Sequence, residues 1–214
     1  GLVLLVLFGV VLTAVVLSAG DALIRLFGSP HSAFPYASEY LFVYGTGTIF
    51  VMISLGLNPF ITAQGFSFTS MATVAIGAVL NIGLDPLFIF AFGMGVKGAA
   101  LATVLSQAVS AAWVTLFFFR RKSQFRFRPA FFRAAPKTVG RILLLGLSPF
   151  IMSVTESAIQ IVFNVNLRLW SGGNSDYTAA LTIMLSANQM VCMPLNGLGT
   201  GVQPLVSYNY GAGN

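Results

Sequence analysis

Charged residues are scarce in this sequence of 214 residues. Asp, Glu, Lys and Arg together make up 7% of it and hydrophobic residues make up 57%, whereas an ordinary soluble domain has about 25% charged residues. Five acids and eleven bases cannot cover the surface of a water-soluble globule of this size. The shortage excludes a soluble domain and indicates an integral membrane protein.

Cysteine and histidine are nearly absent, since each occurs once. Cys192 therefore cannot form a disulfide within the chain. The sequence also lacks the converging His, paired Asp or Ser and Lys residues that a membrane-embedded acyltransferase or protease needs at one depth. We therefore predict that the chain is not an enzyme.

The sequence contains long hydrophobic runs with few charged residues. Crossing about 30 Å of hydrocarbon takes roughly 20 helical residues, and cuts at charge, Gly and Pro leave six such segments, at residues 2–27, 40–63, 69–92, 97–119, 142–170 and 177–206. These runs are apolar on all sides, whereas the strands of a membrane barrel alternate apolar and polar residues. We predict an all-α, polytopic bundle of six transmembrane helices, with residues 207–214 as a turn.

The basic residues predict the orientation of these helices. Eight of the eleven bases lie between residues 120 and 141, and the positive-inside rule places this connection in the cytoplasm. Alternation then places residues 28–39, 93–96 and 171–176 outside, and residues 64–68 and the C-terminal end inside. A basic loop beside a membrane is typical of a topology determinant, so we expect no nucleic-acid partner.

Asp85 is one of two acidic residues deep inside the predicted helices. Asn81 lies one helical turn before it on the same face, and Pro86 is expected to kink the helix. At 1.5 Å per residue, Asp85 is about 10 Å from the outer helix end and Thr103 is about 9 Å from the outer start of the next helix, so the three can share a level. Carboxylate, amide and hydroxyl oxygens suit Na⁺, and the carboxylate alone suffices for H⁺. The alternative is a structural Asp satisfied by hydrogen bonds.

Glu156 is the second deep acid, about 21 Å along its helix from Ile142. A desolvated carboxyl favours its neutral form and could exchange protons, and Gln160 follows on the same face. The alternative is a structural hydrogen bond between helices. Gln160, Asn188 and Gln189 are candidates for a substrate cavity.

Four stretches resemble the MATE (multidrug and toxic compound extrusion) antiporters: residues 58–65 (NPFITAQG), 81–90 (NIGLDPLFIF), 95–107 (GVKGAALATVLSQ) and 203–214 (QPLVSYNYGAGN). The resemblance implies a twelve-helix fold in two lobes. It implies that residues 1–119 are the last four helices of the N-lobe, that 120–141 is the basic inter-lobe loop, and that 142–214 holds the first two helices of the C-lobe. The chain begins with Gly, and we expect it to be a segment of a longer protein. Thr62 departs from the family pattern, in which many members carry Arg.

The resemblance also implies site residues. Asn81, Asp85 and Thr103 would join an Asp of the family's first helix, outside this sequence, in an N-lobe cation site, which is a candidate Na⁺ site. Glu156 would serve coupling in the C-lobe.

The function implied is a secondary active multidrug efflux transporter of the plasma membrane. It would exchange H⁺ or Na⁺ for amphipathic or cationic organic compounds by alternating access, with no cofactor besides the coupling ion. The expected partners are small-molecule drugs or toxic organic cations and the lipid bilayer, and the full-length chain is expected to act as a monomer. One alternative is a lipid or lipid-linked-oligosaccharide flippase of the same wider superfamily, and the other, from a different class, is a membrane-embedded enzyme.

Overall fold

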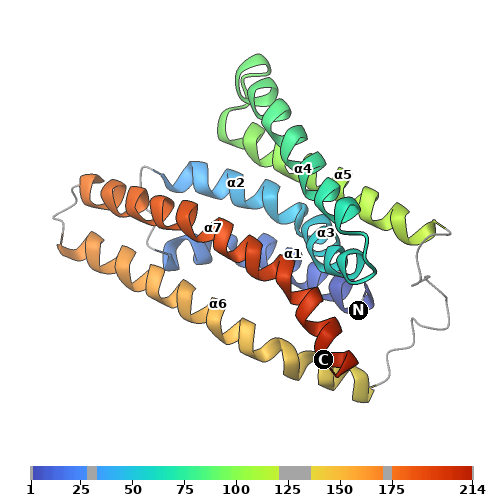
Figure 1. The fold of residues 1–214 in the computed structure, drawn as a ribbon. Coiled ribbons are helices and arrows are strands. Elements are labelled where there is room, and N and C mark those ends of the chain that lie inside the picture. Colours follow the sequence, from blue (N-terminus) through green and yellow to red (C-terminus); the bar gives the residue numbers. More distant parts are fainter. Residues whose placement is uncertain (1, 28–32, 121–135, 171–174, 214) are drawn as a thin grey trace. The chain divides into compact units, whose positions relative to one another are not determined.

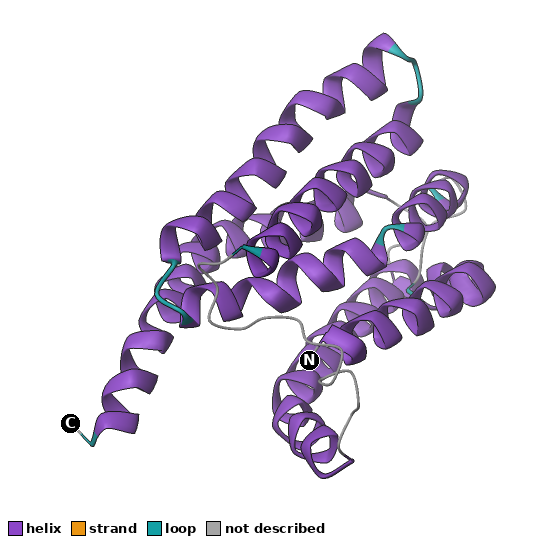
Figure 2. Ribbon diagram, turned by 90° about the vertical axis from the view of Figure 1, so that its right-hand side faces the viewer, coloured by secondary structure: helices purple, strands orange, loops and turns teal. Residues whose placement is uncertain are grey.

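The computed structural model describes residues 2–27, 33–120, 136–170 and 175–213. The predicted loop at 28–31, most of the basic connection and residues 171–174 lie outside these ranges. Every regular element within them is a helix (Figures 1 and 2), which confirms the predicted all-α class. The elements are α1 (Leu2–Leu26), α2 (Phe34–Thr46), α3 (Thr48–Ala63), α4 (Ser67–Pro86), the π-helix η1 (Leu87–Ala91), α5 (Gly95–Phe119), α6 (Pro136–Trp170) and α7 (Ser175–Ala212).

The contacts divide the chain into two units, Gly1–Ser153 and Val154–Asn214. Four helices of the described residues are long and apolar enough to cross a membrane, and α2 with α3 is a fifth if this bent pair forms one span. In the first unit, α5 packs against α2, α3 and α4. The small hydrophobic core of the first unit consists of Leu57, Ile61, Val114, Phe117 and Phe118.

The second predicted helix is broken, so its prediction as one helix over 40–63 is wrong. α2 already begins at Phe34, and α2 and α3 meet at Gly47 with a bend of 56°. A Cβ at Gly47 would lie 2.5 Å from Val104 Cγ2, so a side chain at this break would collide with α5. The Thr13 hydroxyl donates a 3.1 Å hydrogen bond to the Gly45 carbonyl beside the break. A side-chain donor thus satisfies a backbone group near the break, as apolar surroundings require.

Two other boundaries differ from the prediction. Residues 207–214 were expected to form a turn, but α7 continues to Ala212 and ends where Gly213 adopts a φ of 77°. A growing helix adds a hydrogen bond per residue and overrides the weak preferences of Ser, Asn and Tyr. α6 begins at Pro136, inside the stretch predicted as a loop, because proline is tolerated in the first turn of a helix.

The predicted kink at Pro86 takes the form of a π-helix. Directly after Pro86, the Phe92 N–H donates to the Leu87 carbonyl at 3.0 Å, a spacing of five residues. Proline supplies no N–H to the preceding turn, and a wider turn is one way to restore backbone pairing beyond it. The irregular backbone therefore begins close to Asp85, directly after the proline that follows it.

Candidate functional site

Asn81, Asp85 and Thr103 meet between α4 and α5. These helices pack against each other (Figure 1) and run in opposite directions, joined through η1 and the short turn before Gly95. The Asn81 side-chain Nδ2 lies 3.4 Å from Asp85 Oδ1 and 3.3 Å from Thr103 Oγ1. The shared level predicted for the three residues is therefore present in the structure.

The Asn81 amide joins the hydroxyl group of this cluster to its single carboxylate. All three residues are half-buried, and the Thr103 hydroxyl donates to the Ala99 carbonyl at 3.0 Å. Among the described residues, no basic side chain pairs with Asp85. One acid with neutral amide and hydroxyl oxygens can take up a proton or a hard monovalent cation.

The described residues hold no cluster of the kind that binds a transition metal. Within the described ranges, no three His, Cys, Asp or Glu side chains gather as they would around a metal ion. The Asp85 cluster has a carboxyl, an amide and a hydroxyl group, which are not the soft ligands that transition metals prefer.

The C-terminal candidates lie in the second unit. Glu156 and Gln160 are exposed on α6, one turn apart, and Asn188 and Gln189 are exposed on α7. Beside them, the Cys192 thiol donates a 3.3 Å hydrogen bond to Asn188 Oδ1. Their assignment to coupling and to a substrate cavity stays a prediction.

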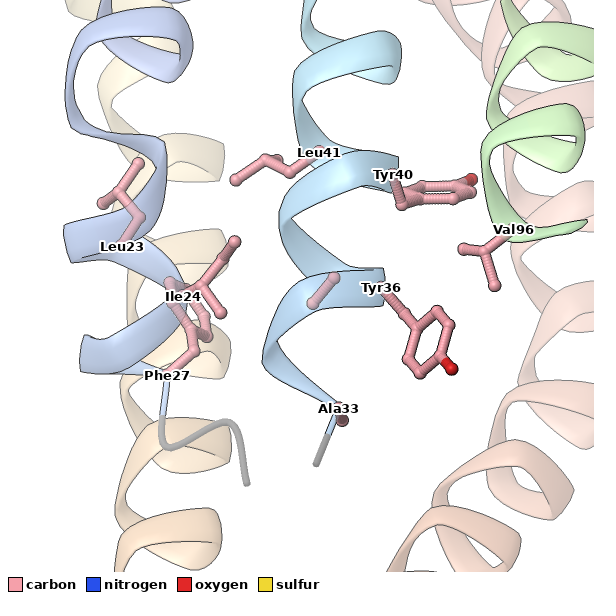
Figure 3. A pocket seen from close by; sticks show the side chains of 9 residues that line it. Leu23, Ile24, Phe27, Ala33, Tyr36, Tyr40, Leu41 and Val96 are labelled. Atoms are coloured by element: carbon pink, nitrogen blue, oxygen red, sulfur yellow. The ribbon is translucent and has the colours of Figure 1, made fainter. Parts of the chain in front are cut away.

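A pocket of about 610 Å³ lies in the first unit. Figure 3 shows Leu23 and Ile24 on α1 and Phe27 directly after its end, with Tyr36 and Tyr40 reaching from α2 toward Val96 at the start of α5. Its lining is almost entirely apolar and includes no residue of the Asp85 cluster. It is therefore distinct from the candidate cation site.

Sequence reasoning missed a second set of polar residues, which lie on the same two helices as the Asp85 cluster. Ser70, Thr73, Ser106 and Ser110 are all buried, on α4 and α5. The signal was available, because Ser70, Thr73, Gly77, Asn81 and Asp85 recur every three or four residues and share one helix face. Such small residues read as packing positions until their hydrogen-bond partners are known.

Comparisons with known proteins point to one family. The family model described as MatE matches residues 1–87 and 149–214. The multidrug export protein MepA of Staphylococcus saprophyticus is 28% identical over 204 residues, which cover 95% of this chain and 45% of the relative.

Solved structures show the same similarity. The MATE multidrug transporter DinF-BH, solved in complex with a ligand, has a TM-score of 0.88 and 31% identity, over 99% of this chain and 47% of that one. A multidrug resistance MATE family transporter of the MOP superfamily, solved in an outward-facing conformation, has a TM-score of 0.83 and 28% identity, over 98% and 46%. The chain thus spans about half the length of the relatives it matches.

Proposed function

Because the chain belongs to the MatE family, we propose that it forms part of a cation-coupled exporter of organic compounds. It is a multi-pass protein of the plasma membrane, in keeping with its apolar helices. Its named relatives are multidrug exporters and transporters, and the same activity is proposed here for the whole protein. Its substrates would be amphipathic or cationic small molecules.

The Asp85 cluster is the observation that carries this proposal. A carboxyl inside a membrane helix with no basic partner among the described residues is costly while charged. Binding H⁺ or Na⁺ neutralises it. The ion therefore has a different binding free energy in conformations that expose Asp85 to water to different extents, which is what coupling requires.

The backbone beside Asp85 offers a way to transmit the change in its charge to the neighbouring helix. Asp85 is followed directly by Pro86 and η1, and α5 is held against η1 at Gly98, where a Cβ would come within 2.9 Å of the Phe88 carbonyl. Neutralising Asp85 weakens its attraction for the Asn81 amide, and the irregular turn beside it can shift more easily than a continuous α-helix. Alternating access between inward and outward openings follows if this shift favours one opening.

Replacing Asp85 with Asn tests the proposal. In proteoliposomes holding the full-length protein, an imposed H⁺ or Na⁺ gradient should drive efflux of a fluorescent organic cation. We expect Asp85→Asn to slow this efflux by about tenfold or more, because the charge that the ion neutralises is gone.

The matched control is Asp21→Asn. Asp21 is an exposed acid near the end of α1 that accepts a 2.8 Å hydrogen bond from the Ser38 hydroxyl, and its loss should leave efflux close to wild type. Undiminished gradient-driven efflux in Asp85→Asn, with normal expression, would overturn the proposed coupling role.

A further inference from the structure

Buried and half-buried polar side chains continue from the Asp85 cluster toward the predicted cytoplasmic connection at residues 64–68. From Ser70 to Asp85, fifteen steps of 1.5 Å or about 22 Å of helix, they follow one face of α4. The facing residues lie on α5 and α3. We call this set the polar row; its members are Asn58, Thr62, Ser70, Thr73, Asn81, Asp85, Thr103, Ser106 and Ser110.

Hydrogen bonds connect much of the polar row across helices. The Ser110 hydroxyl donates to the Thr73 carbonyl at 3.2 Å. At the cytoplasmic end, the Thr62 hydroxyl donates to the Ser70 hydroxyl at 2.8 Å, and Asn58 Nδ2 lies 3.4 Å from the Ser70 carbonyl. With the Asn81 contacts at the other end, both ends are held by side-chain hydrogen bonds.

Ser106 is the break in this row. It lies one turn along α5 from Thr103, is only 2% exposed, and its hydroxyl has no hydrogen-bond partner among the described residues. An enclosed, unpaired hydroxyl costs about 1–3 kcal/mol. Because the helices of the first unit already enclose the oxygen, a further helix of the full-length protein cannot reach it while they stay in place. A water molecule admitted by a small separation of the helices can.

The packing at this level favours a proton over a metal cation. A Cβ at Gly77 would lie 2.5 Å from the Ser110 hydroxyl oxygen and 3.8 Å from the Ser106 carbonyl, so α4 and α5 approach closely here. A cation stripped of its water needs several oxygens around it and more room than this approach leaves. A single water joining hydroxyl groups needs far less.

We propose that the polar row is a gated proton route between Asp85 and the cytoplasmic end of α4, with Ser106 as the residue that binds its connecting water. This proposal rests on the proposed function. The proton passes between water and the hydroxyl groups of the row, each of which accepts one proton and releases another, so that these groups are unchanged at the end. The amides of Asn81 and Asn58 donate hydrogen bonds that hold their neighbours in place, and they carry no proton. The seam between α4 and α5 is closed in this structure, and its opening would be the gate.

Few charges surround the carboxyl at the start of this route. The elements packed against α4 are α3, α5 and η1, and the one charged residue in their sequences is Lys97, exposed in the first turn of α5. Asp85 is therefore the one acid in the helices that carry the route.

The test compares three substitutions of Ser106 in the full-length protein in proteoliposomes. Ser106→Ala removes the hydroxyl, Ser106→Val removes it and adds bulk, and Ser106→Thr adds nearly the same bulk but keeps the hydroxyl. We expect H⁺-driven efflux to fall about tenfold in the Ala and Val variants, the scale of one lost hydrogen bond to a proton carrier. It should stay near wild type in Ser106→Thr. The ratio of rates in H₂O and D₂O should rise in Ser106→Ala, with the drug Kd unchanged.

Thr115→Val on the same helix is the control, because the Thr115 hydroxyl donates within its own helix, to the Ala111 carbonyl at 2.7 Å. If Val and Thr at position 106 both prevent folding, Ser106→Ala decides. A wild-type rate and isotope ratio in Ser106→Ala overturns the proton route while leaving the proposed function standing. The proton route is also overturned if a Na⁺ gradient drives efflux by the wild-type protein and an H⁺ gradient does not. If neither gradient drives efflux by the wild-type protein, the result instead contradicts the proposed function.

Discussion

At the scale of single residues, the side-chain amide of Asn81 connects the other two residues of the candidate cation site. It is the group that contacts both the Asp85 carboxylate and the Thr103 hydroxyl, from the middle of α4 to α5. Asp85 supplies the charge, whereas Asn81 holds that charge at a defined distance from α5. Substitutions of the two residues should therefore have different effects.

Asn81→Ala should shift the response to the coupling ion without abolishing it. Losing hydrogen bonds to a charged group costs about 1.5–3 kcal/mol, which predicts a change of about tenfold or more in the ion concentration that half-saturates transport. For H⁺ the change is a decrease, because the lost donor stabilised the charged, ion-free carboxylate. The measurement is the ion dependence of efflux by the full-length protein. Asn166→Ala is the control, because Asn166 Nδ2 bonds to the Val162 carbonyl of its own helix at 2.8 Å. An unchanged half-saturating concentration in Asn81→Ala would remove Asn81 from the site.

At the scale of the elements, the break between α2 and α3 depends on the absence of side chains. Gly45 and Gly47 lie at it, and a Cβ at either would come within 2.5 Å of a valine, Val16 on α1 and Val104 on α5. The bend thus brings the chain close to two neighbouring helices at once. A tight approach of this kind is sensitive to a single methyl group.

Gly47→Ala should destabilise the protein by about 1–3 kcal/mol through overpacking against Val104. Thermal unfolding of the full-length protein in detergent measures the change, and the double variant with Val104→Ala should recover part of it. Gly83→Ala is the matched control, since nothing lies within 4 Å of a Cβ there. Equal unfolding temperatures for Gly47→Ala and wild type would show that the break tolerates a side chain.

At the scale of the whole molecule, the distribution of charge governs how the helices cross the membrane. Eight bases lie in the connection at 120–141, and the two-unit division of the chain falls later, within α6. The orientation derived from these bases places the Asp85 cluster in the outer half of the membrane and the Asn58 end of the polar row toward the cytoplasm. The direction of the proposed proton route depends on this orientation.

Single cysteines introduced at Arg128 and Phe92, in a full-length protein whose other cysteines are replaced, test the orientation. A membrane-impermeant thiol reagent should label the cysteine of Phe92→Cys in intact cells, because Phe92 is 63% exposed beside the predicted outer turn. It should label the cysteine of Arg128→Cys only in inverted vesicles. The reverse pattern would contradict both the orientation and the direction of the proton route.

The membrane class, most helix positions and the level shared by Asn81, Asp85 and Thr103 could be predicted from the sequence. These features depend on local quantities: the length of apolar runs, the rise of a helix and the spacing of residues on one face. The π-turn after Pro86 was predicted only as a kink, because proline indicates lost pairing and does not specify how the backbone compensates.

The tertiary structure alone decided the break at Gly47 and the pairing of the polar row. Gly47 on its own is compatible with a continuous helix, and only its approach to Val104 shows why it stands at a bend. Ser106 reads as an ordinary small residue until its enclosure without a partner among the described residues is known. Packing and hydrogen-bond satisfaction are relations between helices distant in sequence, so local patterns do not contain them.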